Sequence, residues 1–266
     1  MRRRWLALGL LLAAALAAQA KPLVYCADAG PEGFDPSLWD STSTSNVTSQ
    51  LFNGLVGFVR GTTQLKPKLA TAWQIAPDAK SFTFTLRRGV KFHSTPTFTP
   101  TREMNADDVI FTFRRMTDAQ HPFHKAFAVP YVYAQSLGLA EMIDGIDRVD
   151  EHTVRFRLKR PNVTFLSYFS AAFAGIHSAE YAAQLLAEGR ASAINNQPVG
   201  AGPYQLKSYR KDDVVRLLPH AGYWGGVQKT TQLIYAISRE PAVRVQKMAA
   251  GECHITAPLR DIDIAA

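Results

Sequence analysis

The side-chain types used in catalysis and in metal or phosphate binding occur in this sequence, but not at the required spacings. His121 and His124 fit no standard metal-ligand pattern, and Pro122 between them stiffens the segment, so we interpret it as a turn before or within a helix. The glycine-rich stretch 200–203 ends in Pro203, which lacks the N–H of a phosphate cradle, and we expect a tight turn into a strand there. There is no G-x-S-x-G or H-E-x-x-H motif. A secreted hydrolase is therefore a remote alternative, and we expect no catalytic residues, no metal and no cofactor.

The first twenty residues have the pattern of a signal peptide. Arginines at 2–4 precede an apolar run at 5–17, and Ala18-Gln19-Ala20 is an A-x-A cleavage site, so we expect mature protein from Lys21. The run is shorter than the roughly 20 residues that span a bilayer, which disfavours the alternative of a membrane anchor. No cysteine follows the cleavage site directly, which disfavours a lipid anchor. The sequence therefore predicts an exported protein.

Two cysteines, Cys26 and Cys253, are present. In an oxidising compartment an even pair predicts one disulfide, and the alternative is two unpaired buried thiols. Two cysteines cannot form a zinc site alone, and no histidine lies at ligand spacing beside them. We expect a bridge between the first strand, around 23–26, and a segment near the end of the chain.

Composition and charge indicate an ordinary globular domain. Hydrophobic residues make up 47% of the chain, enough for a sizeable core. Without the three arginines of the signal peptide, 27 basic residues face 22 acidic ones, so the formal charge falls from +8 to +5. The basic residues are scattered, with no basic and aromatic patch, and we expect no nucleic-acid partner.

The elements that must position any site form a mixture of strands and helices. Alternating or apolar runs predict strands, and helical spacing with suitable caps predicts helices. The expected strands are 23–26, 81–86, 153–158, 233–237 and one starting at Tyr204. The expected helices are 44–52, 107–116, 179–187 and 241–250.

The segment Phe98–Met116 is the most informative one. Asn105 is a good N-cap residue, and Asp107 and Asp108 place negative charge at the positive end of the following helix. The segment resembles the ADDV-containing segment of the bacterial family 5 extracellular solute-binding proteins, and in particular the peptide-binding branch of ABC importers. The same resemblance continues, in order, at 31–36, 69–73, 84–93, 198–204 and 222–225.

This resemblance implies an α+β fold of the class II periplasmic-binding-protein type, in which two lobes close over a ligand. We expect a first lobe at residues 21–266, with 21–69 and 196–266 as its core and about 70–195 as an inserted subdomain. The second lobe, with the family's main anchors for the ligand's termini, is expected to be absent from this chain. The cysteine pair also looks like the one that bridges the first lobe in relatives.

Five residues correspond to a loop that approaches the ligand backbone in such relatives: Asp40, Ser41, Thr42, Ser43 and Thr44. Hydroxyls and free backbone groups on a short polar loop can pair with peptide N–H and C=O groups. The alternative interpretation is a plain capping series for the helix expected from Thr44.

The function implied is that of a periplasmic receptor, which binds a ligand and catalyses no reaction. We expect a monomer that binds di- or oligopeptides and delivers them to the permease subunits of an ABC importer at the inner membrane. The open alternatives are a non-peptide ligand, a cationic peptide or haem. Since one wall of the cleft is expected here, we also expect weak ligand binding and exposed apolar surface.

Overall fold

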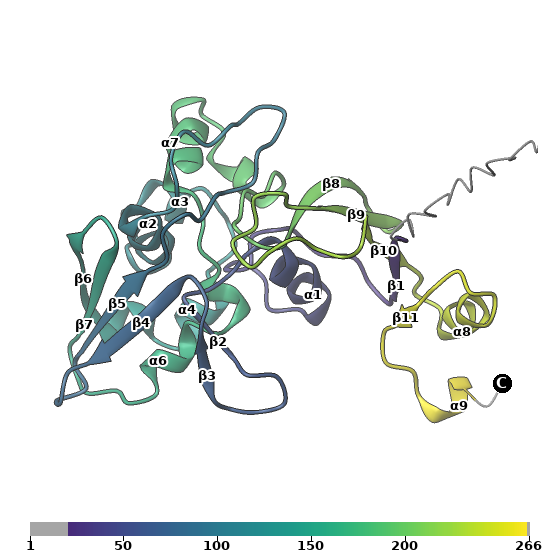
Figure 1. Cartoon of the computed structure of the whole chain (residues 1–266), viewed down its shortest axis with the longest axis horizontal. Coiled ribbons are helices and arrows are strands. Elements are labelled where there is room, and N and C mark those ends of the chain that lie inside the picture. Colours follow the sequence, from purple (N-terminus) through teal and green to yellow (C-terminus); the bar gives the residue numbers. More distant parts are fainter. Residues whose placement is uncertain (1–20, 265–266) are drawn as a thin grey trace, which may run out of the picture.

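The computed structural model describes residues 21–264, and the signal peptide predicted at 1–20 lies outside them. Two sheets dominate the structure, with helix α1 (Thr42–Leu51) between them (Figure 1). No helix in the described range is long and apolar enough to cross a membrane.

The first sheet has five strands in the order β11-β1-β10-β9-β8. Strand β1 lies parallel to β10 and β11, and the other neighbours are antiparallel. It is assembled from both ends of the described chain: β1 Leu23–Ala27, β8 Tyr204–Arg210, β9 Val214–Pro219, β10 Leu233–Ile237 and β11 Ile255–Thr256.

The second sheet has four antiparallel strands in the order β4-β5-β7-β6. They are β4 Ala70–Ile75, β5 Ser81–Leu86, β6 Ile143–Asp150 and β7 Thr153–Leu158, and a separate hairpin joins β2 Val56–Phe58 to β3 Leu65–Pro67. Alternate residues of β5 and β7 are buried, and Phe84 and Phe156 pack edge to face inside the core. The alternation in the sequence therefore predicted the correct faces.

Nine α-helices and two 3₁₀ helices are present within residues 21–264. Besides α1 they are α2 Ala106–Thr117, α3 Pro122–Lys125, α4 Val132–Ser136, α5 Leu139–Met142, α6 Phe165–Tyr168, α7 Ala179–Ala187, α8 Pro241–Ala249 and α9 Asp261–Ile264, with η1 Ala172–Ala174 and η2 Ala191–Asn195.

Helix α2 begins as the sequence predicted. The Asn105 side chain accepts from the Asp107 N–H, and the Asp108 carboxylate accepts from the Asn105 N–H at 2.9 Å, which completes a capping box. Burial raises the pKa of Asp108, although a bidentate pair with Arg102 opposes that shift. Val109, Phe113 and Met116 point into the core.

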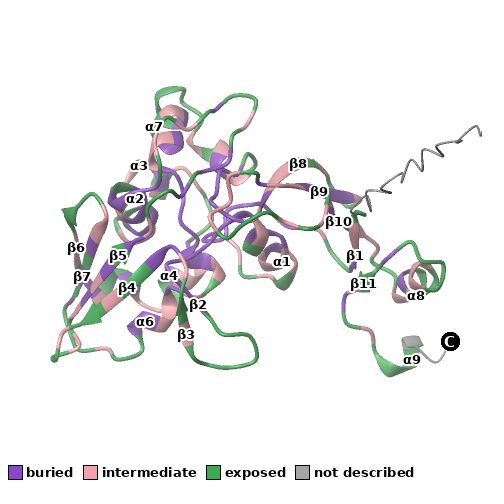
Figure 2. Ribbon diagram, in the orientation of Figure 1, coloured by how far each residue is buried: buried purple, intermediate pink, exposed green. Residues whose placement is uncertain are grey.

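Two apolar clusters correspond to the two sheets. The larger one surrounds the four-stranded sheet and is rich in phenylalanine, and the smaller one fills the space between α1 and the five-stranded sheet. Figure 2 shows buried residues on the facing sides of these elements and also along several connecting segments at the centre of the molecule, whereas many peripheral loops are exposed. The second sheet begins at Ala70 and η2 ends at Asn195, but the proposed division into core and inserted subdomain stays a prediction.

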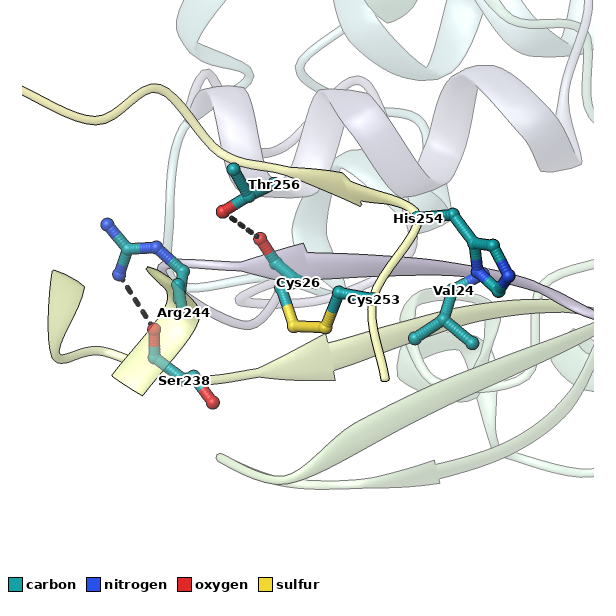
Figure 3. Close-up of a disulfide and its surroundings, with 7 residues drawn as sticks. All are labelled: Val24, Cys26, Ser238, Arg244, Cys253, His254 and Thr256. Carbon is teal, nitrogen blue, oxygen red and sulfur yellow. Dashed lines mark hydrogen bonds between the residues drawn. A yellow bond between two sulfur atoms is a disulfide. The ribbon is translucent and has the colours of Figure 1, made fainter. Parts of the chain in front are cut away.

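The predicted disulfide between Cys26 and Cys253 is present, with 5.8 Å between the two Cα atoms (Figure 3). It joins β1 to the segment that precedes β11. In the same region the Thr256 hydroxyl donates to the Cys26 carbonyl at 3.4 Å, and the Arg244 guanidinium donates to the Ser238 carbonyl at 2.8 Å. The bridge and the parallel pairing therefore hold residues 253–256 against the first strand.

Candidate ligand-binding site

The polar residues expected to contact a ligand follow β1 and include the start of α1. Asp40 precedes the helix, Ser41 is its N-cap, and Thr42, Ser43 and Thr44 form its first turn. The helix therefore begins two residues earlier than the predicted start at Thr44. The correction has a local cause: the Ser41 hydroxyl accepts from the Thr44 N–H at 3.2 Å, so capping is done by Ser41.

Two of the five hydroxyl or carboxyl side chains are already engaged with Glu32. The Ser41 hydroxyl donates to Glu32 Oε2 at 2.6 Å, and the Thr44 hydroxyl donates to the same oxygen. The Glu32 N–H in turn donates to Thr44 Oγ1 at 3.1 Å. Burial alone would raise the pKa of Glu32, but these hydroxyl bonds outweigh it and lower the pKa. The capping interpretation thus accounts for Ser41 and Thr44.

Three side chains of the predicted set are left for a ligand. Asp40 and Thr42 are exposed and Ser43 is half-buried, and none of the three side chains has a hydrogen-bond partner among residues 21–264. The amides at the start of a helix have no acceptors within the helix, and the first turn of α1 contains no acidic residue. This end of α1 therefore presents hydroxyls, backbone donors and one carboxylate to the outside.

A buried ionic cluster supports the chain just before these residues. Arg115 of α2 binds Asp35 through both terminal nitrogens, with Nη2 2.8 Å from Oδ1, and Nη2 also donates to Ser37 Oγ at 3.0 Å. Burial would raise the pKa of Asp35, but Arg115 and then His177 hold it well below its usual range. His177 lies 3.4 Å from Asp35, and its own pKa is lowered to about 4, mainly by burial.

Sequence reasoning missed this cluster. In the sequence, Arg114 and Arg115 are two adjacent basic residues near the end of the predicted helix, where either could compensate the helix dipole, so the sequence alone does not single out Arg115. The available signal was helical spacing, because Thr112 follows Asp108 by four residues, Arg115 follows Thr112 by three, and all three are buried. The partner, Asp35, lies 80 residues away in the sequence.

The other candidates have structural roles. His121 is the N-cap of α3, where its Nδ1 accepts from the Phe123 N–H at 3.2 Å, and His124 Nδ1 lies 3.0 Å from the Arg115 carbonyl oxygen. Within the described part of the chain, no group of three or more His, Cys, Asp or Glu residues could hold a metal. The strand predicted from Tyr204 is confirmed as β8.

This arrangement of two sheets and helices is that of a class II periplasmic binding protein. A crystal structure of a dipeptide-binding protein from Pseudoalteromonas sp. SM9913 in complex with Met-Leu superposes with a TM-score of 0.89 and 42% identity, over 92% of this chain and 48% of that one. The family model for bacterial extracellular solute-binding proteins, family 5 Middle, matches residues 64–266. The chain belongs to the bacterial extracellular solute-binding proteins of family 5.

Two curated relatives bear on the ligand. The di/tripeptide-binding protein 4 of Pseudomonas aeruginosa is 46% identical over 96% of this chain and 48% of its own length. The heme-binding protein A of Haemophilus influenzae is 38% identical over 87% of this chain and 43% of its own length. The chain spans about half the length of the curated relatives it matches.

Proposed function

We propose that this chain contributes the peptide-contacting wall of a solute-binding protein that serves an ABC importer. The observation that carries the proposal is the set of unpaired groups at the start of α1, where Thr42 and Ser43 offer hydroxyls and backbone N–H groups. A bound peptide displays carbonyl oxygens that need such donors, since an unpaired buried carbonyl costs binding free energy. Asp40 adds an acceptor for peptide N–H groups or for an ammonium group.

The names of the similar proteins support a peptide ligand, and so does the chemistry of the site. Haem is the second candidate because of the 38% identical heme-binding relative. Haem would need an apolar slot and an axial ligand such as His, Met, Cys or Tyr, and Asp40, Thr42 and Ser43 supply neither. The polar start of α1 fits a peptide backbone better than a porphyrin.

The cellular context belongs to the same proposal. Residues 1–20 would direct export to the periplasm, the mature protein would act as a monomer, and ligand would select a closed form that docks on the permease. Membership of family 5 also supports the proposed division into a core at 21–69 and 196–266 and a subdomain at 70–195. The chain would bind its ligand without chemical turnover.

The test is a titration of the purified chain with mixed di- and tripeptides, with haem as a second arm and a peptide hydrolysis assay as a third. We expect NMR shifts of the Thr42 and Ser43 amides with peptides, at concentrations above the micromolar range. Shifts at these amides with haem alone would replace peptide by haem as the ligand. Peptide cleavage without any shift would overturn the receptor function itself.

A further inference from the structure

The segment that leads into the start of α1 is held from a second side by Asn195, at the end of η2. The Asn195 carbonyl oxygen accepts from the Phe34 N–H at 2.8 Å. Its side-chain oxygen accepts twice, from the Asp35 N–H at 3.1 Å and from Trp39 Nε1 at 3.0 Å. One residue, distant in sequence, therefore bonds to three positions of the segment immediately before Asp40.

The fit of Asn195 against this segment is close. A Cβ added to Gly33 would overlap the Asn195 side-chain amide, so a larger residue at position 33 would displace it. Asn195 is half-buried, whereas the Arg115 and Asp35 pair on the other side is fully buried. The segment is thus clamped between a buried ion pair and an amide near the surface.

Hydrogen bonds to Asn195 and to Glu32 hold the chain on either side of Asp40. Trp39 is bonded to Asn195 directly before Asp40, and Ser41 and Thr44 are bonded to Glu32 directly after it. These hydrogen bonds hold the backbone that carries Asp40, Thr42 and Ser43. The three side chains themselves make no hydrogen bond within residues 21–264. Groups that are fixed before binding lose less conformational entropy when a ligand arrives.

We infer that Asn195 is a positioning residue for the candidate ligand site. Its side-chain oxygen sets the position of Trp39 and Asp35, and through them the orientation of the Asp40–Ser43 stretch. Asn195 itself does not touch the ligand. The expected effect of Asn195 on ligand affinity rests on the proposed function. Its effect on the Asp40–Ser43 stretch can be measured without any ligand.

The test compares Asn195→Ala, which removes the acceptor, with Asn195→Asp, which keeps a side-chain oxygen in place. Asn162→Ala is the matched control, because the Asn162 side-chain oxygen also accepts two hydrogen bonds, both from Thr164 and neither from residues 32–44. The readouts are hydrogen exchange of the Thr44 and Ser45 amides, which bond to Ser41, together with the unfolding midpoint and dipeptide affinity.

We expect Asn195→Ala to speed exchange at Thr44 and Ser45 and to weaken dipeptide binding by about fivefold, the scale of ordering one or two side chains. Asn195→Asp should show the amide exchange and the dipeptide affinity of the wild type. Asn162→Ala should also leave the exchange rates and the affinity unchanged. Unchanged exchange in Asn195→Ala would overturn the positioning role. Faster exchange in a protein that binds no peptide in any form would instead leave that role standing and remove the proposed function.

Discussion

Arg115 and Asp35 form an ion pair with Nη2 2.8 Å from Oδ1, and both side chains are fully excluded from solvent. The pair joins α2, which packs on the four-stranded sheet, to the segment that leaves β1. Burying two charges is costly unless each is paired and hydrogen-bonded. Ser37 accepts a further hydrogen bond from Arg115, and His177 lies 3.4 Å from Asp35, while Arg115 Nε has no hydrogen-bond partner among the described residues.

Removing one partner of this pair should destabilise the protein more than removing both. We expect Asp35→Ala to lower the free energy of unfolding by about 3 to 5 kcal/mol, because the Arg115 charge would stay buried without a counterion. The double variant Asp35→Leu with Arg115→Met should lose clearly less. Urea unfolding followed by circular dichroism measures both, and an equal loss in the two variants would contradict an ionic origin.

The disulfide should stabilise the chain mainly through its long loop. The cysteines are 227 residues apart in sequence, and the chain-entropy estimate for such a loop is at most about 5 kcal/mol. We expect a reductant to lower the urea midpoint of the wild-type chain. The variant with Cys26→Ser and Cys253→Ser should start at the lower midpoint and be insensitive to reductant.

Stability should fall as the pH drops below about 6.5, partly because of His93. Burial lowers the pKa of His93 to about 3, and the neutral ring accepts from the Gly200 N–H while its other nitrogen contacts the Gly202 carbonyl. Between pH 6.5 and pH 3 the unfolded state therefore binds a proton at His93 and the folded state does not. The contribution of His93 to the free energy of unfolding is complete above pH 6.5 and is progressively lost as the pH falls.

The free energy of unfolding of the wild-type protein should therefore fall with a measurable slope as the pH is lowered. His93→Gln should reduce that slope by up to about 1.4 kcal/mol per pH unit. Urea unfolding at pH 7, 6, 5 and 4 measures the slope for both proteins. His177, with its pKa lowered to about 4, should keep part of the slope in the variant. A variant slope equal to that of the wild type would show that folding does not lower the pKa of His93.

Gly200 should tolerate no side chain, because the backbone of α1 lies against it. A Cβ at this position would overlap the Leu51 carbonyl oxygen and lie 2.9 Å from its carbon. We expect Gly200→Ala to cost about 1 to 3 kcal/mol by overpacking. At Gly222 the nearest atoms belong to the side chains of His220 and Lys91, at 3.2 and 3.3 Å, so Gly222→Ala should cost less.

Removing the free hydroxyls should weaken peptide binding without unfolding the protein. We expect Thr42→Val and Ser43→Ala each to lower dipeptide affinity by about two- to tenfold, the range for one lost hydrogen bond. Ser49→Ala, on the exposed side of the same helix, is the control and should leave the affinity unchanged. NMR titration gives the affinities, and a loss that is equal in the control would point to a general effect on α1.

The sequence predicted most of the elements whose signals are local. The bounds of β5, β7, β10 and α7 match the predicted ranges, since strict alternation marks β5 and β7, a short apolar run marks β10 and a cap marks α7. Strands such as β4 and β6 were missed, because neither has a regular apolar alternation: most of β4 is exposed, and β6 carries a glycine and several acids. Their place is decided by pairing with β5 and β7.

The candidate site was predicted less completely. The stretch Asp40–Thr44 was predicted from the resemblance to family 5 and stays a prediction, whereas the fold and the disulfide that the sequence indicated are present. Whether its hydroxyls face a ligand or the protein depends on Glu32, which engages Ser41 and Thr44 and leaves Thr42 and Ser43 unpaired.

The local sequence by itself determined the helix caps, the alternating strands and the family. Only the tertiary structure decided which polar groups satisfy one another, as Asp35 with Arg115 and Trp39 with Asn195 do across 80 and 156 residues. The physical reason is that capping and alternation act within a few residues, whereas a buried charge or amide is stabilised by whichever partner the folded chain brings within hydrogen-bonding distance.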